Sequence, residues 1–175
     1  MPNSFQPQLF FFADDGQFPN SPLPVLLYRG FTAAVEGPLD DWFEERLVAN
    51  NWRGVWRDGI LPYDHYHSTT HEVLCVYRGW VTVLLGGPQG EKFTLQPGDV
   101  AVLPAGVSHR ALESSADYGV LGAYPEGRSW DLLTGAPGER PAADQRIQQL
   151  PIPAQDPLYG TAGPLVSLWT QPGRM

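Results

Sequence analysis

The segment Gly59-Ile-Leu-Pro-Tyr-Asp-His65-Tyr-His67-Ser-Thr-Thr-His71-Glu72 holds most of the chemistry that the chain can offer. His65 and His67 are two residues apart, and on an extended strand that spacing places both imidazoles on the same face. Imidazole is a ligand for Fe, Zn, Cu and Ni, and two histidines with one carboxylate and open positions form the ligand set of non-haem Fe(II) oxygenases. The segment therefore predicts a transition-metal site.

Histidine is concentrated in this part of the chain. Three of the four histidines lie between positions 65 and 71, and the fourth, His109, ends a glycine- and proline-containing motif on a later strand-like stretch. A single histidine on an apolar strand is most often an ordinary core or surface imidazole, but this clustering favours one site whose ligands come from two strands.

The spacing also resembles that of a known family. Gly59, His65, His67, Glu72 and Gly79 stand at the offsets of the first cupin motif. The second motif is matched by Gly98, Pro104, Gly106 and His109, and eighteen residues separate the two motifs. Nine residue types at expected offsets make this resemblance specific, although the second motif usually has Asn four residues after its histidine, where this chain has Glu113. The chain is thereby similar to small bacterial single-domain cupins of unassigned function.

The resemblance implies a double-stranded β-helix, the cupin jelly-roll barrel, and one divalent transition metal (Fe, Mn, Ni or Zn) held by four ligands. These ligands are His65, His67, Glu72 and His109. On the strand that follows residues 68–70, Glu72 shares a face with Leu74 and Val76 and would approach the metal, whereas His71 would point away. A β-bulge would exchange the two and give an all-histidine site, but only Glu72 keeps the offset to Gly79. We therefore expect His71 to be a surface or interface imidazole.

Composition limits the other classes of function. A chain of 175 residues fits one domain with its own core, and 19 glycines and 18 prolines beside many aromatics favour an all-β fold with irregular segments. A net charge of −8 disfavours nucleic acid and anionic membranes as partners. Because Cys75 is the single cysteine, no internal disulfide can form, and we expect it to be a small buried hydrophobic residue. Without an apolar run long enough for a signal or a membrane helix, we expect a cytoplasmic protein.

The chain divides into three parts within a single domain of residues 1–175. An N-terminal arm and one helix over about 39–50, capped by Asp40 or Asp41, occupy residues 1–51. The barrel core spans about 52–124. A Pro/Gly-rich extension over 125–175 carries recurring apolar anchors and a short helix at 142–149, and it would wrap its own barrel or a dimer partner. Exposed strand edges and this tail lead us to expect a homodimer.

These features predict a metalloenzyme acting on a small oxygen-rich substrate, of the dioxygenase, isomerase or decarboxylase type, with dioxygenase-like chemistry favoured. Glu72 and Tyr63, which shares a face with His65 and His67, are the candidate catalytic residues. The alternative is a non-catalytic small-ligand binding or sensor protein with a structural metal. An open coordination position facing a cavity would distinguish the enzyme from this alternative.

Overall fold

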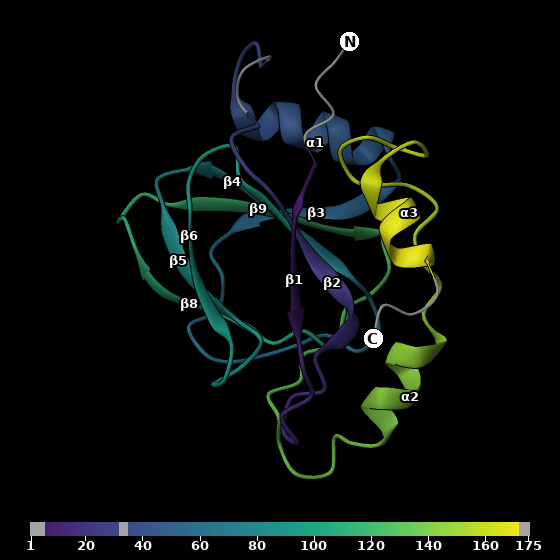
Figure 1. Cartoon of the computed structure of the whole chain (residues 1–175). Coiled ribbons are helices and arrows are strands. Elements are labelled where there is room, and N and C mark those ends of the chain that lie inside the picture. The colour runs from purple at the N-terminus through teal and green to yellow at the C-terminus, as the bar shows by residue number, and fades with distance from the viewer. Residues whose placement is uncertain (1–5, 32–34, 172–175) are drawn as a thin grey trace.

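The computed structural model describes residues 6–31 and 35–171, and within them it contains two antiparallel sheets and three helices (Figure 1). The larger sheet has six strands in the order β1 (Gln8–Phe12), β2 (Ser21–Tyr28), β7 (Val100–Leu103), β4 (Glu72–Arg78), β9 (Gly119–Pro125) and β3 (Trp52–Asp58). The smaller sheet has the order β6 (Glu91–Leu95), β5 (Val81–Leu85) and β8 (His109–Ser114). Neighbouring strands are mostly not consecutive in the chain, as in a jelly roll, and the predicted double-stranded β-helix barrel is confirmed.

The larger sheet has an apolar core on each of its faces. Along β4, Leu74 and Val76 face the smaller sheet and belong to the core of the barrel. Val73 and Cys75 alternate with them and belong to a second core on the outer face. This alternation follows from the period of two in a β-strand, and a strand that is buried on both faces has to be apolar almost throughout. Cys75 is fully buried, as expected.

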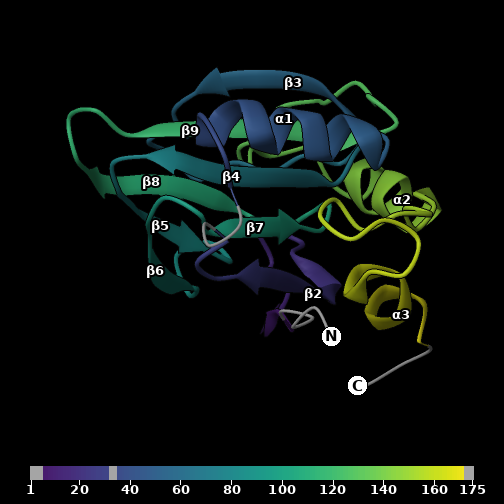
Figure 2. The same cartoon turned by 90° about the horizontal axis from the view of Figure 1, so that it is seen from above.

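Helix α1 (Leu39–Ala49) covers the outer face of the larger sheet over β3, β4 and β9 (Figure 2). Its buried residues Phe43 and Leu47 are four positions apart, which explains why one stripe packs on the sheet. The predicted helix is confirmed, but the predicted cap is wrong. Pro38 is the N-cap residue and no side chain caps the helix. Asp40 and Asp41 lie inside the first turn, where negative charge complements the helix dipole.

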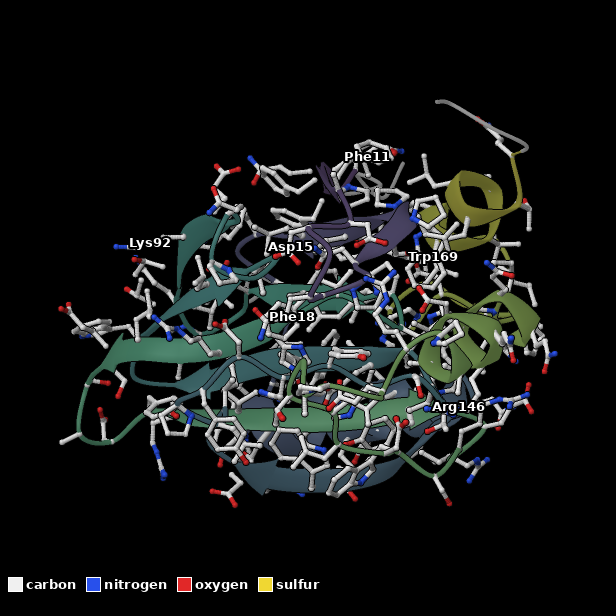
Figure 3. All side chains as sticks on the ribbon, turned by 90° about the horizontal axis from the view of Figure 1, so that it is seen from below. Phe11, Asp15, Phe18, Lys92, Arg146 and Trp169 are labelled. Carbon is white, nitrogen blue, oxygen red and sulfur yellow. The ribbon has the colours of Figure 1, made fainter. Side chains whose placement is uncertain are left out.

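The C-terminal extension packs on its own barrel. Helix α2 (Ala142–Gln149) is the predicted short helix, and α3 (Pro164–Thr170) packs against β2 through the buried side chains of Leu165 and Trp169 (Figure 3). Between them, the buried carboxylate of Asp156 accepts a hydrogen bond from Tyr28 at 2.5 Å and another from the backbone of Leu165 at 3.1 Å. No helix within 6–31 or 35–171 combines the length and the apolar character needed to cross a membrane.

Candidate metal centre

Backbone bridges, rather than a regular strand, hold the first two histidines in place. His65 exchanges backbone hydrogen bonds with His109, the first residue of β8, at 3.3 and 2.9 Å. Tyr66 does the same with Leu133 of the C-terminal extension, at 2.9 and 3.0 Å. The backbone of residues 65–67 is therefore extended although it forms no named strand, and His65 and His67 still share a face.

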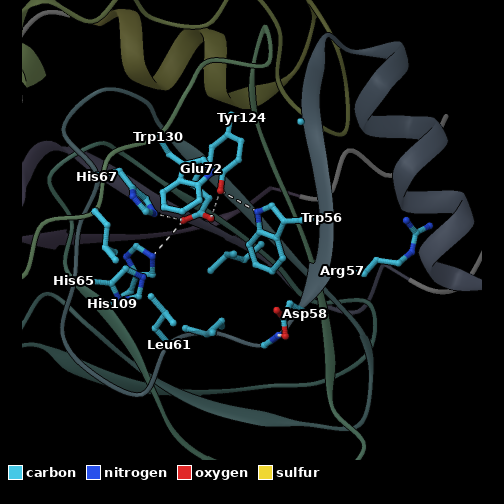
Figure 4. A pocket seen from close by; sticks show the side chains of 15 residues that line it. Trp56, Arg57, Asp58, Leu61, His65, His67, Glu72, His109, Tyr124 and Trp130 are labelled. Atoms are coloured by element: carbon cyan, nitrogen blue, oxygen red, sulfur yellow. Dashed lines mark hydrogen bonds and ion pairs between the residues drawn. The ribbon is translucent and has the colours of Figure 1, made fainter.

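The three imidazoles of His65, His67 and His109 converge inside the barrel (Figure 4). One ring nitrogen from each lies within 4.8 Å of the others, and all three side chains are buried. The ring centroids of His65 and His109 are 4.1 Å apart, and those of His67 and His109 are 5.4 Å apart. These three histidines could hold one metal ion.

In each of the three rings, Nδ1 contacts a backbone carbonyl oxygen outside the cluster, and this contact leaves Nε2 facing the centre. Nδ1 of His65 lies 2.9 Å from the carbonyl oxygen of Tyr63, and Nδ1 of His109 lies 3.0 Å from that of Val107. Nδ1 of His67 contacts the carbonyl oxygen of Asp131. A carbonyl oxygen only accepts, so each Nδ1 carries a proton, and each neutral ring presents the lone pair of Nε2 to the centre. This is the orientation that metal-binding histidines adopt.

Glu72 completes the set of inward acceptors. Its Oε2 lies 3.2 Å from Nε2 of both His67 and His109, while Oε1 accepts a hydrogen bond from the hydroxyl of Tyr124 at 3.3 Å. Oε2 is buried, and among the described residues no group donates a hydrogen bond to it. The two rings beside it carry their protons on Nδ1, which faces away from Oε2. Three lone pairs and a carboxylate oxygen that face one another need a cation or a proton between them. The donor set therefore fits a divalent transition metal.

The shifted pKa values of Glu72, His67 and His65 also reflect how close these groups lie to one another. Burial raises the pKa of Glu72, but the interactions with the imidazoles of His109 and His67 together outweigh burial and lower it, so the carboxylate is ionised. Burial lowers the pKa of His67, but the interactions of the ring with Glu72 and Asp131 together outweigh burial and raise it. Burial and the neighbouring His109 lower the pKa of His65 to about 3, so that this ring is neutral at pH 7. The ionised carboxylate of Glu72 and the neutral imidazole of His65 are the forms that bind metals.

A pocket of about 430 Å³ opens beside these residues. Its walls are formed largely by apolar side chains from β3, from β4, from the loop before His65 and from the C-terminal extension, namely Trp56, Leu74, Ile60, Leu61, Trp130 and Leu132. Trp56 donates its indole N–H to the hydroxyl of Tyr124 at 2.9 Å, so Trp56, Tyr124 and Glu72 form one hydrogen-bonded chain in the wall (Figure 4). A small molecule in this pocket would contact Glu72 and the three converging histidines directly.

The other two residues singled out in the sequence lie outside the centre. Tyr63 is 43% exposed, its ring centroid is 5.8 Å from that of His65, and it is not among the residues that line the pocket. His71 is buried against Trp169, at a centroid distance of 4.9 Å, and its Nδ1 accepts the backbone N–H of Ala105 at 2.9 Å. The expectation of a surface or interface imidazole is therefore wrong, since α3 covers His71. Burial lowers the pKa of His71 to about 4.

Sequence patterns did not reveal the role of Asp131. Its carboxylate accepts hydrogen bonds from the backbone N–H groups of Ser68 at 2.7 Å and Thr69 at 3.2 Å, and its carbonyl oxygen contacts His67. It thus supports the loop that carries one of the converging histidines. Asp131 lies 64 positions from His67 in a segment without periodic pattern, so no local signal could have indicated this contact.

Comparison with known proteins identifies the family. No family model matches the chain. The protein YjlB of Bacillus subtilis, described as uncharacterized, is 41% identical over 166 residues, which cover 94% of this chain and 97% of YjlB. Among solved structures, acireductone dioxygenase from Bacillus anthracis with a cadmium ion in its active centre has a TM-score of 0.39 and 14% identity, over 57% of this chain and 76% of that one. A DUF861 family protein from Thermotoga maritima has a TM-score of 0.32 and 25% identity, over 51% and 92%. Taken with the two motifs and the barrel, the identity to YjlB places the chain in the YjlB family of small bacterial cupins.

Proposed function

We propose that this cupin is a metalloenzyme that binds one divalent transition metal through His65, His67, Glu72 and His109 and acts on a small oxygen-rich substrate. The observation that carries the proposal is the meeting of four buried acceptors, three Nε2 atoms and one carboxylate oxygen, with every outer nitrogen already engaged by a carbonyl. Such a cluster is unfavourable unless a cation neutralises it.

The surrounding residues support catalysis rather than a closed structural site. A structural metal site is closed by protein ligands, whereas a catalytic site keeps a position for water or substrate. Here a pocket of about 430 Å³ adjoins the four residues and would supply that position. When bound, the metal would act as a Lewis acid or bind O₂ beside a chelating substrate, which favours dioxygenase-like chemistry.

The protein's own groups then have separate roles. The carbonyl oxygens beyond the rings orient the imidazoles, and Tyr124 holds Oε1 of Glu72 while Oε2 faces the rings of His67 and His109, where it would help to hold the metal. The apolar walls exclude water from the reacting atoms. Glu72 is our first candidate for proton transfer. Tyr63, exposed beside the His65 ring, is the second and would act on a substrate that reaches the rim of the pocket.

Metal analysis of two variants tests the ligand set. His67→Ala should lower the metal content of the purified protein to near zero. His71→Ala should leave it largely intact, because that ring lies under α3 against Trp169. If His71→Ala lost its metal while His67→Ala kept it, the proposed set of ligands would be contradicted.

Oxygen uptake tests the reaction. The wild-type protein is loaded with Fe(II) under anaerobic conditions, and oxygen consumption is then followed with a panel of small diols, enediols and thiols. Substrate-dependent uptake at about one metal per chain is the expected result. Metal binding without uptake would exclude dioxygenase activity on this panel, and binding of a panel compound without turnover would favour the non-catalytic alternative.

We also propose that two copies of the chain associate. β1 is at the edge of the larger sheet, and it exposes Leu9 and Phe11, the latter with 56% of its surface accessible. An exposed apolar edge strand favours pairing with another strand. Light scattering at micromolar concentration should give the mass of a dimer, and a monomer mass would remove this proposal.

A further inference from the structure

The walls of the pocket point to a narrower class of substrate. Resting on the function proposed above, we infer that the pocket selects a molecule with a flat apolar body, stacked on Trp130, whose only negative charge belongs to the group that chelates the metal. The inference rests on three features of the lining: its charges, its hydrogen-bonding atoms and the position of Trp130.

The first feature is the charge distribution. Among the described residues that line the pocket, Arg57 is the one basic side chain besides the three imidazoles. Its guanidinium is directed away from the pocket to the start of α1, where it pairs with Asp40 at 2.9 Å and Glu44 at 2.7 Å (Figure 4). Asp58 adds a carboxylate to the lining. A phosphate or a second carboxylate on the substrate would meet no counter-charge here, and an unpaired charge is costly to remove from water.

The second feature is that the polar groups of two aromatic residues in the wall, Trp56 and Tyr124, are already engaged. The indole N–H of Trp56 is donated to Tyr124, and the hydroxyl of Tyr124 is donated to Glu72. Trp56 and Tyr124 therefore offer a ligand apolar surface instead of free hydrogen-bond donors. A pocket of this kind recognises the body of a ligand by shape and burial, and polar recognition is left to the metal.

The third feature is Trp130 at the rim. Its side chain is 52% exposed, although its ring lies 5.8 Å from that of His67 at an interplanar angle of 65°. Its neighbour Asp131 is tied to the loop of residues 68–69 by hydrogen bonds, so the indole is presented by an anchored segment. An anchored and half-exposed indole beside a metal site can stack on a planar ligand without a large loss of side-chain freedom.

Matched chelators test this inference by isothermal titration calorimetry on the full-length protein loaded with Zn(II). Benzohydroxamate and acetohydroxamate chelate through the same group and differ only in the body of the molecule. Benzohydroxamate should bind at least about tenfold more tightly, which corresponds to about 1.4 kcal/mol and to the size of one aromatic contact with its buried area. Adding a carboxylate at the far end of the ring, in 4-carboxybenzohydroxamate, should weaken binding.

Variants then assign the effect to one side chain. Trp130→Ala should lose about tenfold in affinity for benzohydroxamate and change acetohydroxamate binding little. Trp80→Ala is the matched control, because Trp80 is also partly exposed but does not line the pocket. Equal affinity for the two hydroxamates, tighter binding of the carboxylated ring, or an unchanged Trp130 variant would each overturn the inference. The zinc content is measured in every sample, so a failure to bind metal, which would refute the proposed function, is distinguished from a failure of selectivity.

Discussion

Replacing Asp131 by alanine tests whether the C-terminal extension supports the metal centre. Asp131 is one of the residues through which residues 125–171 contact the loop of His67, and its side chain is only 25% exposed. The substitution removes the acceptors of the Ser68 and Thr69 backbone N–H groups and of both hydroxyls, while the backbone carbonyl that contacts His67 remains. The loop would then hold His67 less firmly.

The size of the effect follows from these contacts. A hydrogen bond to a charged group contributes about 1.5–3 kcal/mol. The bond from Ser68 at 2.7 Å is short and the one from Thr69 at 3.2 Å is longer, and water can partly replace the carboxylate at this half-buried position. We therefore expect the free energy of unfolding to fall by about 2 kcal/mol, which lowers the Tm of a chain of this length by about 4–8 °C. Metal affinity should fall by about tenfold, as is usual for residues that orient a ligand.

Two measurements on the same samples decide the outcome. Thermal unfolding of the chelator-treated protein by circular dichroism gives the change in Tm, and competition with a chelator gives the change in metal affinity. Asp131→Asn, which keeps one side-chain acceptor, should show a smaller effect in both. Glu45→Gln, on an exposed position of α1, is the control. A Tm and a metal affinity that both match the wild type in Asp131→Ala would refute the reasoning, and a lower Tm with unchanged affinity would refute the coupling to His67.

Three further predictions concern the side chains around the centre and the extension. Tyr124→Phe removes the hydrogen bond to Oε1 of Glu72 and should weaken metal binding by about tenfold in chelator competition, with the fold retained; equal affinity would contradict its role in positioning the carboxylate. Although burial raises the pKa of Glu139, hydrogen bonds from the backbone of residues 134–135 lower it below 4.5. A lowered pKa stabilises the folded state above the ordinary pKa of the carboxyl, so Glu139→Gln should be less stable than wild type at pH 7, and the difference in denaturation midpoint should vanish as the pH falls through the lowered pKa of Glu139. Trp169→Ala removes a buried indole and should lower the free energy of unfolding in urea by about 3–5 kcal/mol; a loss below about 1 kcal/mol would show that α3 contributes little.

The two motifs that resemble those of cupins indicated the barrel and the joining of His109 to the first two histidines, whereas local pattern indicated helix α1 and the shared face of His65 and His67. Side chains alternate along an extended segment whatever surrounds it, so the spacing of His65 and His67 placed both rings on one face. The same alternation placed Glu72 with Leu74 and Val76 toward the interior of the barrel, where the first two contact the pocket. The inferences from alternation hold because each depends only on residues that are close along the chain.

Tertiary structure decided everything that depends on distant segments. His71 is buried because α3 lies over it, and Arg57 is unavailable to a substrate because α1 brings three carboxylates to it. Asp131 supports His67, and Trp130 forms the rim, because the extension returns to the barrel through the Tyr66–Leu133 bridge. Such contacts follow from the path of the chain in space, and they leave no periodic trace in the sequence from which they could be predicted.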